Sequence, residues 1–184
     1  MKLILASNSA RRQELIKLLD VEYEAISPNI EEINDPSLSH EELVVDLAFQ
    51  KALAVFKNRK DDIVLGFDTL VIIDDLILGK PKSEEEAKHY LQILSGKTHK
   101  VLTGCAIIKK GYSRSFFTQS QVTFWDLTDQ EIDDYIKTKE PMDKAGAYGI
   151  QDHGARFVKS ISGDYFTIVG FPISKIYQEL KKLR

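Results

Sequence analysis

The sequence predicts an α/β fold with a mixed β-sheet, and two observations support this fold class. Segments with helical periodicity alternate with short apolar, β-branched runs along the chain, as in proteins whose sheets are covered by helices. Two pairs of these runs are joined by short turns, which indicates hairpins and therefore antiparallel pairing within the sheet. A chain of 184 residues also buries enough surface to fold on an apolar core, without a disulfide or a metal.

In the first half of the chain, two helices are expected among several strands. An apolar strand at residues 2–6 leads through Ser7-Asn8-Ser9 into a helix over residues 9–19, with Ser9 as its N-cap. Ser39 is placed to cap a longer helix that reaches about residue 58. The remaining elements are strands at residues 22–27, 63–67, 70–73 and 76–78, a loop from Pro28 to Pro36, and a turn at Asp74-Asp75.

In the second half, two capping boxes mark where helices begin. Ser83 with Glu86 opens a helix that ends at Ser95-Gly96, and Thr128 with Glu131 opens a helix that ends at Thr138. The other expected elements are a hairpin of residues 98–109 and 114–125, a Gly-rich stretch at 143–154, a strand at 156–161, and a last helix that starts at Pro172.

The composition limits the classes of partner. The chain has 25 Lys and Arg against 28 Asp and Glu, a net charge of −3, whereas nucleic-acid and membrane-surface proteins carry a basic footprint. No apolar stretch approaches the ~20 residues of a membrane span, and the apolar run near the start is too short for a signal peptide. The single cysteine, Cys105, lies in an apolar run and is interpreted as a small core residue. We therefore expect a cytoplasmic protein that binds neither nucleic acid nor membrane.

The Ser-rich loop after the first strand is a candidate anion site. Arg11 and Arg12 fall in the first turn of the expected helix, where the helix dipole makes each cation unfavourable by roughly 0.3–1 kcal/mol unless an anion is bound. Such a loop leading into a helix N-terminus can cradle phosphate. The pattern predicts a bound phosphate chain, and a solvated basic turn is the alternative.

Two charged residues interrupt apolar patterns. Lys51 falls within the apolar stripe of the long helix, one turn beyond Leu47, and a lysine there needs a partner unless its amine reaches water. Asp68 stands between two apolar strand segments, where a carboxylate is rare unless it is paired or metal-bound. We interpret Asp68 as a general base or a ligand for a hard cation. A carboxylate that caps a strand end is the alternative.

Other motifs carry less information on their own. Lys80 lies between Gly79 and Pro81, a weak signal, since many exposed lysines have such neighbours. The stretch from Glu140 to Gln151 mixes small residues with Asp143 and Lys144, which favours a ligand-facing loop over a plain surface loop. Ser95-Gly96-Lys97-Thr98 is not a P-loop, because the motif's first glycine would fall at Leu91 and a helix precedes it.

Together these segments resemble the Maf family of nucleoside triphosphate pyrophosphatases. They follow the family order over nearly the whole chain, with two departures: Ala10 where proline is usual, and Phe67 where a smaller residue is common. The matching segments are Ser7-Asn8-Ser9-Ala10-Arg11-Arg12, Asp68-Thr69, Gly79-Lys80-Pro81, Leu94-Ser95-Gly96-Lys97-Thr98-His99, residues 140–151 and Gly163-Asp164-Tyr165.

The resemblance implies a fold and an activity. The fold would be a single domain over residues 1–184, with two lobes around a mixed twisted sheet, an active site in the cleft between them, and a likeness to inosine triphosphatase. The activity would be metal-dependent hydrolysis of a nucleoside triphosphate to the monophosphate and pyrophosphate. Arg12, Thr69 and Gln151 match the group that prefers dTTP and UTP, and modified uridine triphosphates are implied as further substrates. The resemblance also implies a cytoplasmic location and allows a homodimer.

Roles for individual residues follow from the same resemblance. Asp68, Lys51 and Lys80 would be catalytic, and Asp68 with Glu32 would bind a divalent cation, Mg²⁺ or Mn²⁺. The residues expected to contact the substrate are Ser7, Ser9, Arg11, Arg12, Thr69, Asp143, Lys144 and Gln151.

A second function stays open beside the enzyme. The family was first associated with inhibition of septum formation, so the chain could be a nucleotide-binding regulator of cell division with little turnover. Asp68 favours the enzyme, because a carboxylate beside a polyphosphate repels the ligand of a protein that only binds.

Overall fold

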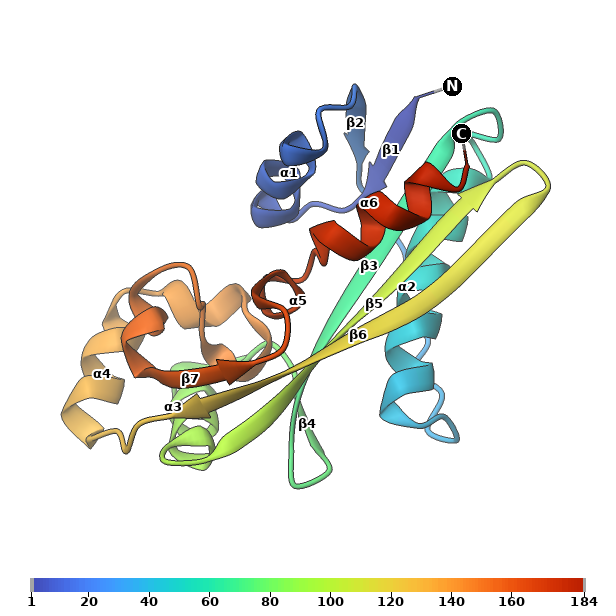
Figure 1. Cartoon of the computed structure of the whole chain (residues 1–184). Coiled ribbons are helices and arrows are strands. Elements are labelled where there is room, and N and C mark those ends of the chain that lie inside the picture. The colour runs from blue at the N-terminus through green and yellow to red at the C-terminus, as the bar shows by residue number, and fades with distance from the viewer. Residues whose placement is uncertain (1, 184) are drawn as a thin grey trace. The chain divides into compact units, whose positions relative to one another are not determined.

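The computed structural model describes residues 2–183, and these divide into two compact units. Unit 1 consists of residues up to Asp68, Thr103–Thr118 and the segment from Gly170 onward, and unit 2 consists of Thr69–Leu102 and Gln119–Val169. Within residues 2–183 no helix combines the length and apolar character that a membrane crossing requires. Figure 1 shows the course of the chain.

The strands of residues 2–183 form one seven-stranded mixed sheet in the order β2-β1-β3-β5-β6-β7, with β4 paired to β3. β1 is parallel to both β2 and β3, whereas β3–β4 and β6–β7 are antiparallel pairs. The strands are β1 (Leu3–Ala6), β2 (Tyr23–Ile26), β3 (Ile63–Ile73), β4 (Leu76–Leu78), β5 (Thr98–Lys109), β6 (Tyr112–Phe124) and β7 (Val158–Ser162).

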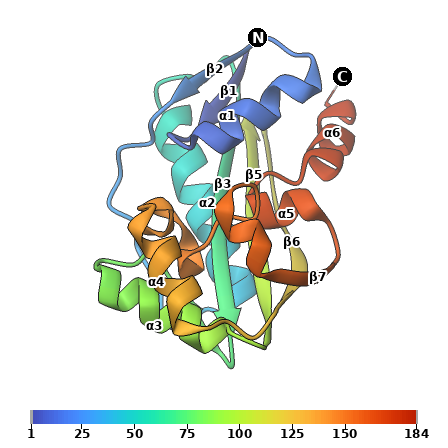
Figure 2. The ribbon, with the colours of Figure 1, turned by 90° about the vertical axis from the view of Figure 1, so that its left-hand side faces the viewer.

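In unit 1, helices lie on both sides of the strands. These helices are α1 (Ala10–Ile16), the 3₁₀ turn η1 (Lys17–Leu19), α2 (His40–Phe56) and α6 (Ile173–Lys181). Figure 2 shows α2 and α6 on opposite sides of the sheet. The core beneath α2 combines small and branched residues: Ile4, Ala6, Ala48, Ala52, Val55, Val64, Ala106 and Ile108.

Two glycines bring α2 close to the sheet. A Cβ on Gly66 of β3 would lie 2.3 Å from the Ala48 carbonyl oxygen and 2.8 Å from the Ala52 Cβ. A Cβ on Gly104 of β5 would lie 2.0 Å from the Val44 carbonyl oxygen. Because real Cβ atoms do not approach backbone this closely, only glycine allows this helix–sheet spacing.

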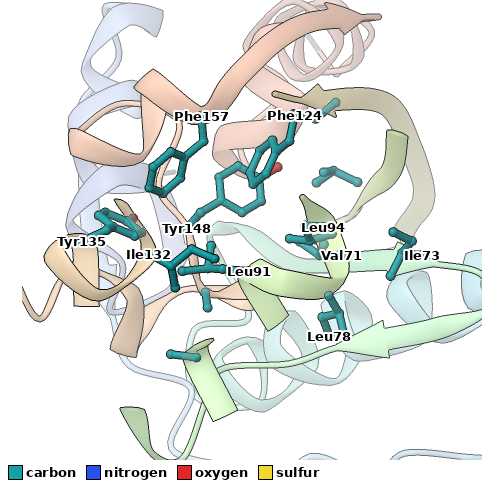
Figure 3. Packing of buried hydrophobic residues seen from close by; sticks show 14 of the residues in the cluster. Val71, Ile73, Leu78, Leu91, Leu94, Phe124, Ile132, Tyr135, Tyr148 and Phe157 are labelled. Carbon is teal, nitrogen blue, oxygen red and sulfur yellow. The ribbon is translucent and has the colours of Figure 1, made fainter. Parts of the chain in front are cut away.

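In unit 2, aromatic rings dominate the core. The helices of this unit are α3 (Glu84–Leu94), α4 (Asp129–Lys137) and α5 (Tyr165–Val169), with 3₁₀ turns η2 (Glu140–Asp143), η3 (Ala145–Ala147) and η4 (His153–Phe157). Figure 3 shows Phe124, Tyr148 and Phe157 packed together, with Tyr135 beside Phe157. The Phe124 and Tyr148 rings meet edge-on, 4.8 Å between centroids, and the Tyr148 hydroxyl lies 2.8 Å from Nε2 of buried His99. Burial lowers the pKa of His99 to about 4, so this histidine is a neutral core residue near pH 7.

Several expected element boundaries are confirmed. Ser9 is the N-cap of α1, and complete capping boxes begin α2 at Ser39 and α4 at Thr128. The helix expected over residues 9–19 ends as an α-helix at Ile16 and continues as η1, which ends where Asp20 turns left-handed at φ 50°. At α3 the box is incomplete: Ser83 accepts from the Glu86 N–H, but the Glu86 carboxylate accepts from the Lys82 N–H instead.

Two expectations are corrected, and one helix, α5, was not expected. The two strand segments on either side of Asp68 are one strand, β3, so the carboxylate interrupts the apolar pattern but not the backbone pairing. The Gly-rich stretch is not plain loop: three 3₁₀ turns, η2, η3 and η4, lie between Glu140 and Phe157, and left-handed Gly146 (φ 70°) breaks the helical backbone inside η3. α5 has five residues, too short for helical periodicity to reveal it.

Replacing Gly104 with alanine should destabilise the protein. The added methyl group meets the backbone of α2, and overpacking of this kind typically costs about 1–3 kcal/mol. Gly79→Ala is the matched control, because no heavy atom lies within 4 Å of its added Cβ; we expect a change within about 0.5 kcal/mol. Urea unfolding at constant m-value measures both. Equal midpoints for the two variants would contradict the close approach of α2.

Candidate functional site

The loop between β1 and α1 is short and internally hydrogen-bonded. Ser7, which is buried, accepts a hydrogen bond from the Ser9 N–H at 3.2 Å through its hydroxyl. The Ser9 hydroxyl in turn accepts from the Arg12 N–H at 3.4 Å. These hydrogen bonds therefore fix the start of α1 and the positions from which the Arg11 and Arg12 side chains extend.

The Arg12 side chain forms hydrogen bonds with other residues of unit 1. Its Nε donates to the Gly170 carbonyl at 2.9 Å, and one terminal nitrogen lies 3.3 Å from the Phe67 carbonyl and 3.4 Å from the Ser7 hydroxyl. Burial lowers the pKa of its guanidinium, while nearby Asp68 acts in the opposite direction. Arg12 thus joins three chain segments; Arg11 and Arg12 are both partly buried.

Lys51, Asp68 and Glu32 meet in unit 1. The Lys51 amine lies 2.5 Å from Asp68 Oδ1 and 2.9 Å from Glu32 Oε1. The Lys51 and Asp68 side chains are only 14% and 13% exposed, and that of Glu32 is 41% exposed. The amine is therefore paired with two carboxylates, which excludes the interpretation that Lys51 merely extends into water.

The local fold explains this meeting. Asp68 lies two residues beyond Gly66 on β3, so both face α2, because alternate residues of a strand share a face. Lys51 lies one residue before Ala52, which with Ala48 is an α2 residue packed against Gly66. The intervening Phe67 points the other way, with its ring 4.8 Å from that of Phe171. Burial raises the pKa of Asp68, and the charge of Lys51 offsets part of this effect.

The two carboxylates fit a cation that the substrate helps to hold. Within the described part of the chain, residues 2–183, no group of three or more His, Cys, Asp or Glu side chains could hold a metal ion. Mg²⁺, however, is commonly bound through one or two carboxylates, with water and substrate phosphates completing its shell. Asp68 and Glu32 provide such a pair around one amine.

The remaining site candidates belong to unit 2. Lys80 is exposed beyond β4, and Thr69, the residue after Asp68, is half-buried. The stretch from Glu140 to Gln151 forms an ordered loop, in which the Gly146 N–H donates to the Gly79 carbonyl at 3.1 Å. This hydrogen bond holds the loop beside the segment that carries Lys80.

Within that loop the charged residues differ in placement. Lys144 is buried, and its amine donates to Asp143 Oδ1 at 2.7 Å and to the Glu140 carbonyl at 3.0 Å. Asp143 and Gln151 are exposed. Lys144 is thus held within the loop.

Sequence reasoning missed Glu140, Tyr135 and His153, which are hydrogen-bonded together at the base of this loop. No sequence pattern marks them, because the contact depends on how the loop folds back. The only available signal was that Glu140 begins the stretch already recognised as unusual.

Comparison with known proteins places the chain in a family. The family model described as Maf-like protein matches residues 2–183. The chain belongs to the Maf-like family. Relatives called dTTP/UTP pyrophosphatase share 51% identity in Bacillus cereus (strain B4264) and 52% in Bacillus thuringiensis subsp. konkukian (strain 97-27). Each alignment covers 181 residues, 98% of this chain and 95% of the relative.

Solved structures confirm the fold class. The Ham1 protein of Staphylococcus aureus aligns over all of both chains with a TM-score of 0.58 at 15% identity. A HAM1 protein from Coxiella burnetii aligns over 99% of both chains with a TM-score of 0.56, also at 15% identity. The expected α/β fold with a mixed sheet is thereby confirmed, and these Ham1 proteins share it.

The raised pKa of Asp68 predicts how stability changes with pH. A carboxyl group whose folded pKa lies above its ordinary value of 3.8 contributes stability below that value and loses the contribution as pH rises through the folded pKa. Relative to Asp68→Asn, the wild type should therefore lose stability as pH rises above about 4. Urea unfolding at a series of pH values measures the difference.

Asp62→Asn is a control of opposite sign. Hydrogen bonds from the Lys2 N–H and from Arg59 lower the pKa of Asp62, so its contribution is present above the ordinary pKa and is lost as pH falls through the folded one. If the stability difference from the wild type changed with pH in the same direction for both variants, the environment assigned to Asp68 would be contradicted.

Proposed function

We propose that this protein hydrolyses dTTP, UTP and modified uridine triphosphates to the monophosphate and pyrophosphate, with a divalent cation. The observation that carries the proposal is that the Lys51 amine pairs with Asp68, both largely buried, and with the more exposed Glu32. Support comes from relatives at 51–53% identity that are called dTTP/UTP pyrophosphatase. The reaction consumes one water and breaks the bond between the α- and β-phosphates.

Positively charged side chains bind the triphosphate in this proposal. A nucleoside triphosphate with about four negative charges requires positive groups, which stabilise the charge that develops in phosphoryl transfer. We assign this role to Arg11, Arg12, Lys51 and Lys80. Ser7 and Ser9 offer hydroxyls in the loop before α1. Since Arg12 already binds backbone carbonyls, its contribution is as much to hold the loop as to attract phosphate.

Asp68 is the group suited to activate water. Its pKa is raised by burial, and a general base works best when its pKa approaches the operating pH. Lys51 contacts the same carboxylate and keeps it oriented. Asp68 and Glu32 would also hold Mg²⁺ or Mn²⁺, which, when bound, acts as a Lewis acid toward the phosphates.

The loop of unit 2 supplies recognition of the base in this proposal. Gln151 offers an acceptor and a donor side by side, which complements the N3–H and O4 of uracil and thymine. Thr69, Asp143 and Lys144 are further substrate contacts that the family resemblance implies. A cytoplasmic location, a single domain over residues 1–184 and a homodimer complete the proposal.

The alternative is a nucleotide-binding regulator of septum formation. It would use the same cations, but it would gain nothing from a carboxylate that repels polyphosphate. The presence of Asp68 among these cations therefore favours the enzyme. Binding of dTTP without release of pyrophosphate would favour the regulator.

Asp68→Asn tests the catalytic assignment. Without the base, kcat for dTTP should fall by roughly 10²- to 10⁴-fold, while nucleotide affinity stays similar or tightens because a repulsive charge is removed. Pyrophosphate release with Mg²⁺ or Mn²⁺ measures the rate, and chelation should abolish release by the wild type until either ion is restored. A variant with near wild-type turnover would remove Asp68 from the mechanism.

Gln151→Glu tests the recognition of the base. The carboxylate keeps the shape of the side chain but loses the donor to O4, at a cost of roughly 1–3 kcal/mol. CTP should lose less or improve, because its N4 amino group can donate to the carboxylate. The ratio of kcat/KM for UTP over CTP should therefore fall. A constant ratio would mean that another group reads the base.

A further inference from the structure

The Glu140 carboxylate is a hydrogen-bond centre inside unit 2. Its side chain is only 9% exposed. Oε1 accepts from the Tyr135 hydroxyl at 2.7 Å and from the Gly154 N–H at 3.2 Å. Oε2 accepts from the His153 N–H at 3.0 Å and lies 2.9 Å from His153 Nδ1. Four contacts use the acceptor capacity of the carboxylate, about four lone-pair sites.

These contacts close a loop at its base. The chain leaves at Glu140 and returns at His153, and the carboxylate joins the two ends. We call the enclosed residues 141–152 the cinched loop. Asp143, Lys144 and Gln151, all assigned above to the substrate, belong to it. An isolated loop of this length would otherwise sample many conformations.

A second point of attachment lies close to Gln151. The Tyr135 hydroxyl donates to Glu140 and accepts from the Gly149 N–H at 3.0 Å. Gln151 is thus two residues from Gly149 on one side and two residues from His153 on the other. His153 is held by the Glu140 carboxylate directly. Gly149 is held by the Tyr135 hydroxyl, which donates to the same carboxylate.

The packing beneath the loop is also tight. A Cβ on Gly149 would lie 2.6 Å from the Lys144 Cε and 3.0 Å from Glu140 Oε1. The Lys144 amine donates to the Glu140 carbonyl at 3.0 Å. Backbone and side chain of Glu140 therefore both hold the loop, and little space remains for it to shift.

We propose that Glu140 is a positioning residue for base recognition: by holding both ends of the cinched loop, it sets the place and orientation of Gln151. Glu140 itself does not contact the nucleotide. The inference rests on the proposed function, since it presumes that the protein discriminates among pyrimidine triphosphates. It adds a determinant of specificity outside the residues that touch the base.

Glu140→Gln is the decisive variant. It preserves the volume of the side chain but replaces an acceptor with an amino group, which then faces the donors of His153 or Gly154. The loop should lose its fixed conformation while Lys51 and Asp68 stay intact. We expect KM for UTP to rise and kcat to change little, since lost uniform binding appears in KM. The UTP over CTP ratio of kcat/KM should fall by about tenfold.

Two further variants separate positioning from a general loss of stability. Glu131→Gln is the matched control: its carboxylate also accepts from a backbone N–H and a hydroxyl, at 2.8 Å and 2.7 Å from Thr128, but lies outside the cinched loop. It should lower the unfolding midpoint and leave the ratio unchanged. Tyr135→Phe removes the link to Gly149 and should lower the ratio in the same direction as Glu140→Gln.

The outcomes are distinct. A fall in the ratio with Glu140→Gln and Tyr135→Phe, but not with Glu131→Gln, supports the inference. If Glu140→Gln fails to fold, Tyr135→Phe decides by itself. If the wild type is active and the folded variants keep its UTP over CTP ratio of kcat/KM, the positioning role is overturned and the proposed function stands. A wild type that releases no pyrophosphate from any nucleotide overturns both.

Discussion

The close approach of α2 to the sheet of unit 1 is the constraint on which the candidate site depends. Gly66 and Gly104 lack the side chains that would push the helix away. At this spacing Lys51 reaches Asp68 within hydrogen-bond distance. A helix displaced by one methyl group would separate these two largely buried charges, and breaking a buried ion pair is far more costly than losing one at the surface.

The same constraint gives Asp68 two opposing influences. Burial disfavours its ionised form, while Lys51 and Arg12 favour it. The balance leaves a carboxylate that is oriented by a cation yet binds a proton more readily than an exposed aspartate. This combination suits a group that must accept a proton and release it again. Structural stability would be better served by an apolar pair at these positions.

The sequence was informative where local rules dominate and less so where the chain folds back on itself. The caps at Ser9, Ser39 and Thr128 follow from local hydrogen bonding and are confirmed. The partners of Lys51 could not be derived from the sequence. The apolar periodicity of the helix shows that a lysine interrupts the pattern, but it does not show which side chains the lysine contacts. Continuity of β3 through Asp68 was missed since propensity disfavours aspartate in strands, whereas pairing and burial outweigh that preference here. The Glu140 contacts depend on the path of a loop, which no periodic pattern encodes.

The continuity of β3 also limits how this family can vary in length. Gly66 and Asp68 face α2 while Phe67 faces Phe171, so the strand presents its residues to two environments in strict alternation. Loss or gain of one codon between them would exchange the two faces. The aromatic ring would then meet the helix backbone and the carboxylate would meet Phe171. Insertions and deletions in related chains should therefore avoid this short segment, even where substitutions within it are tolerated.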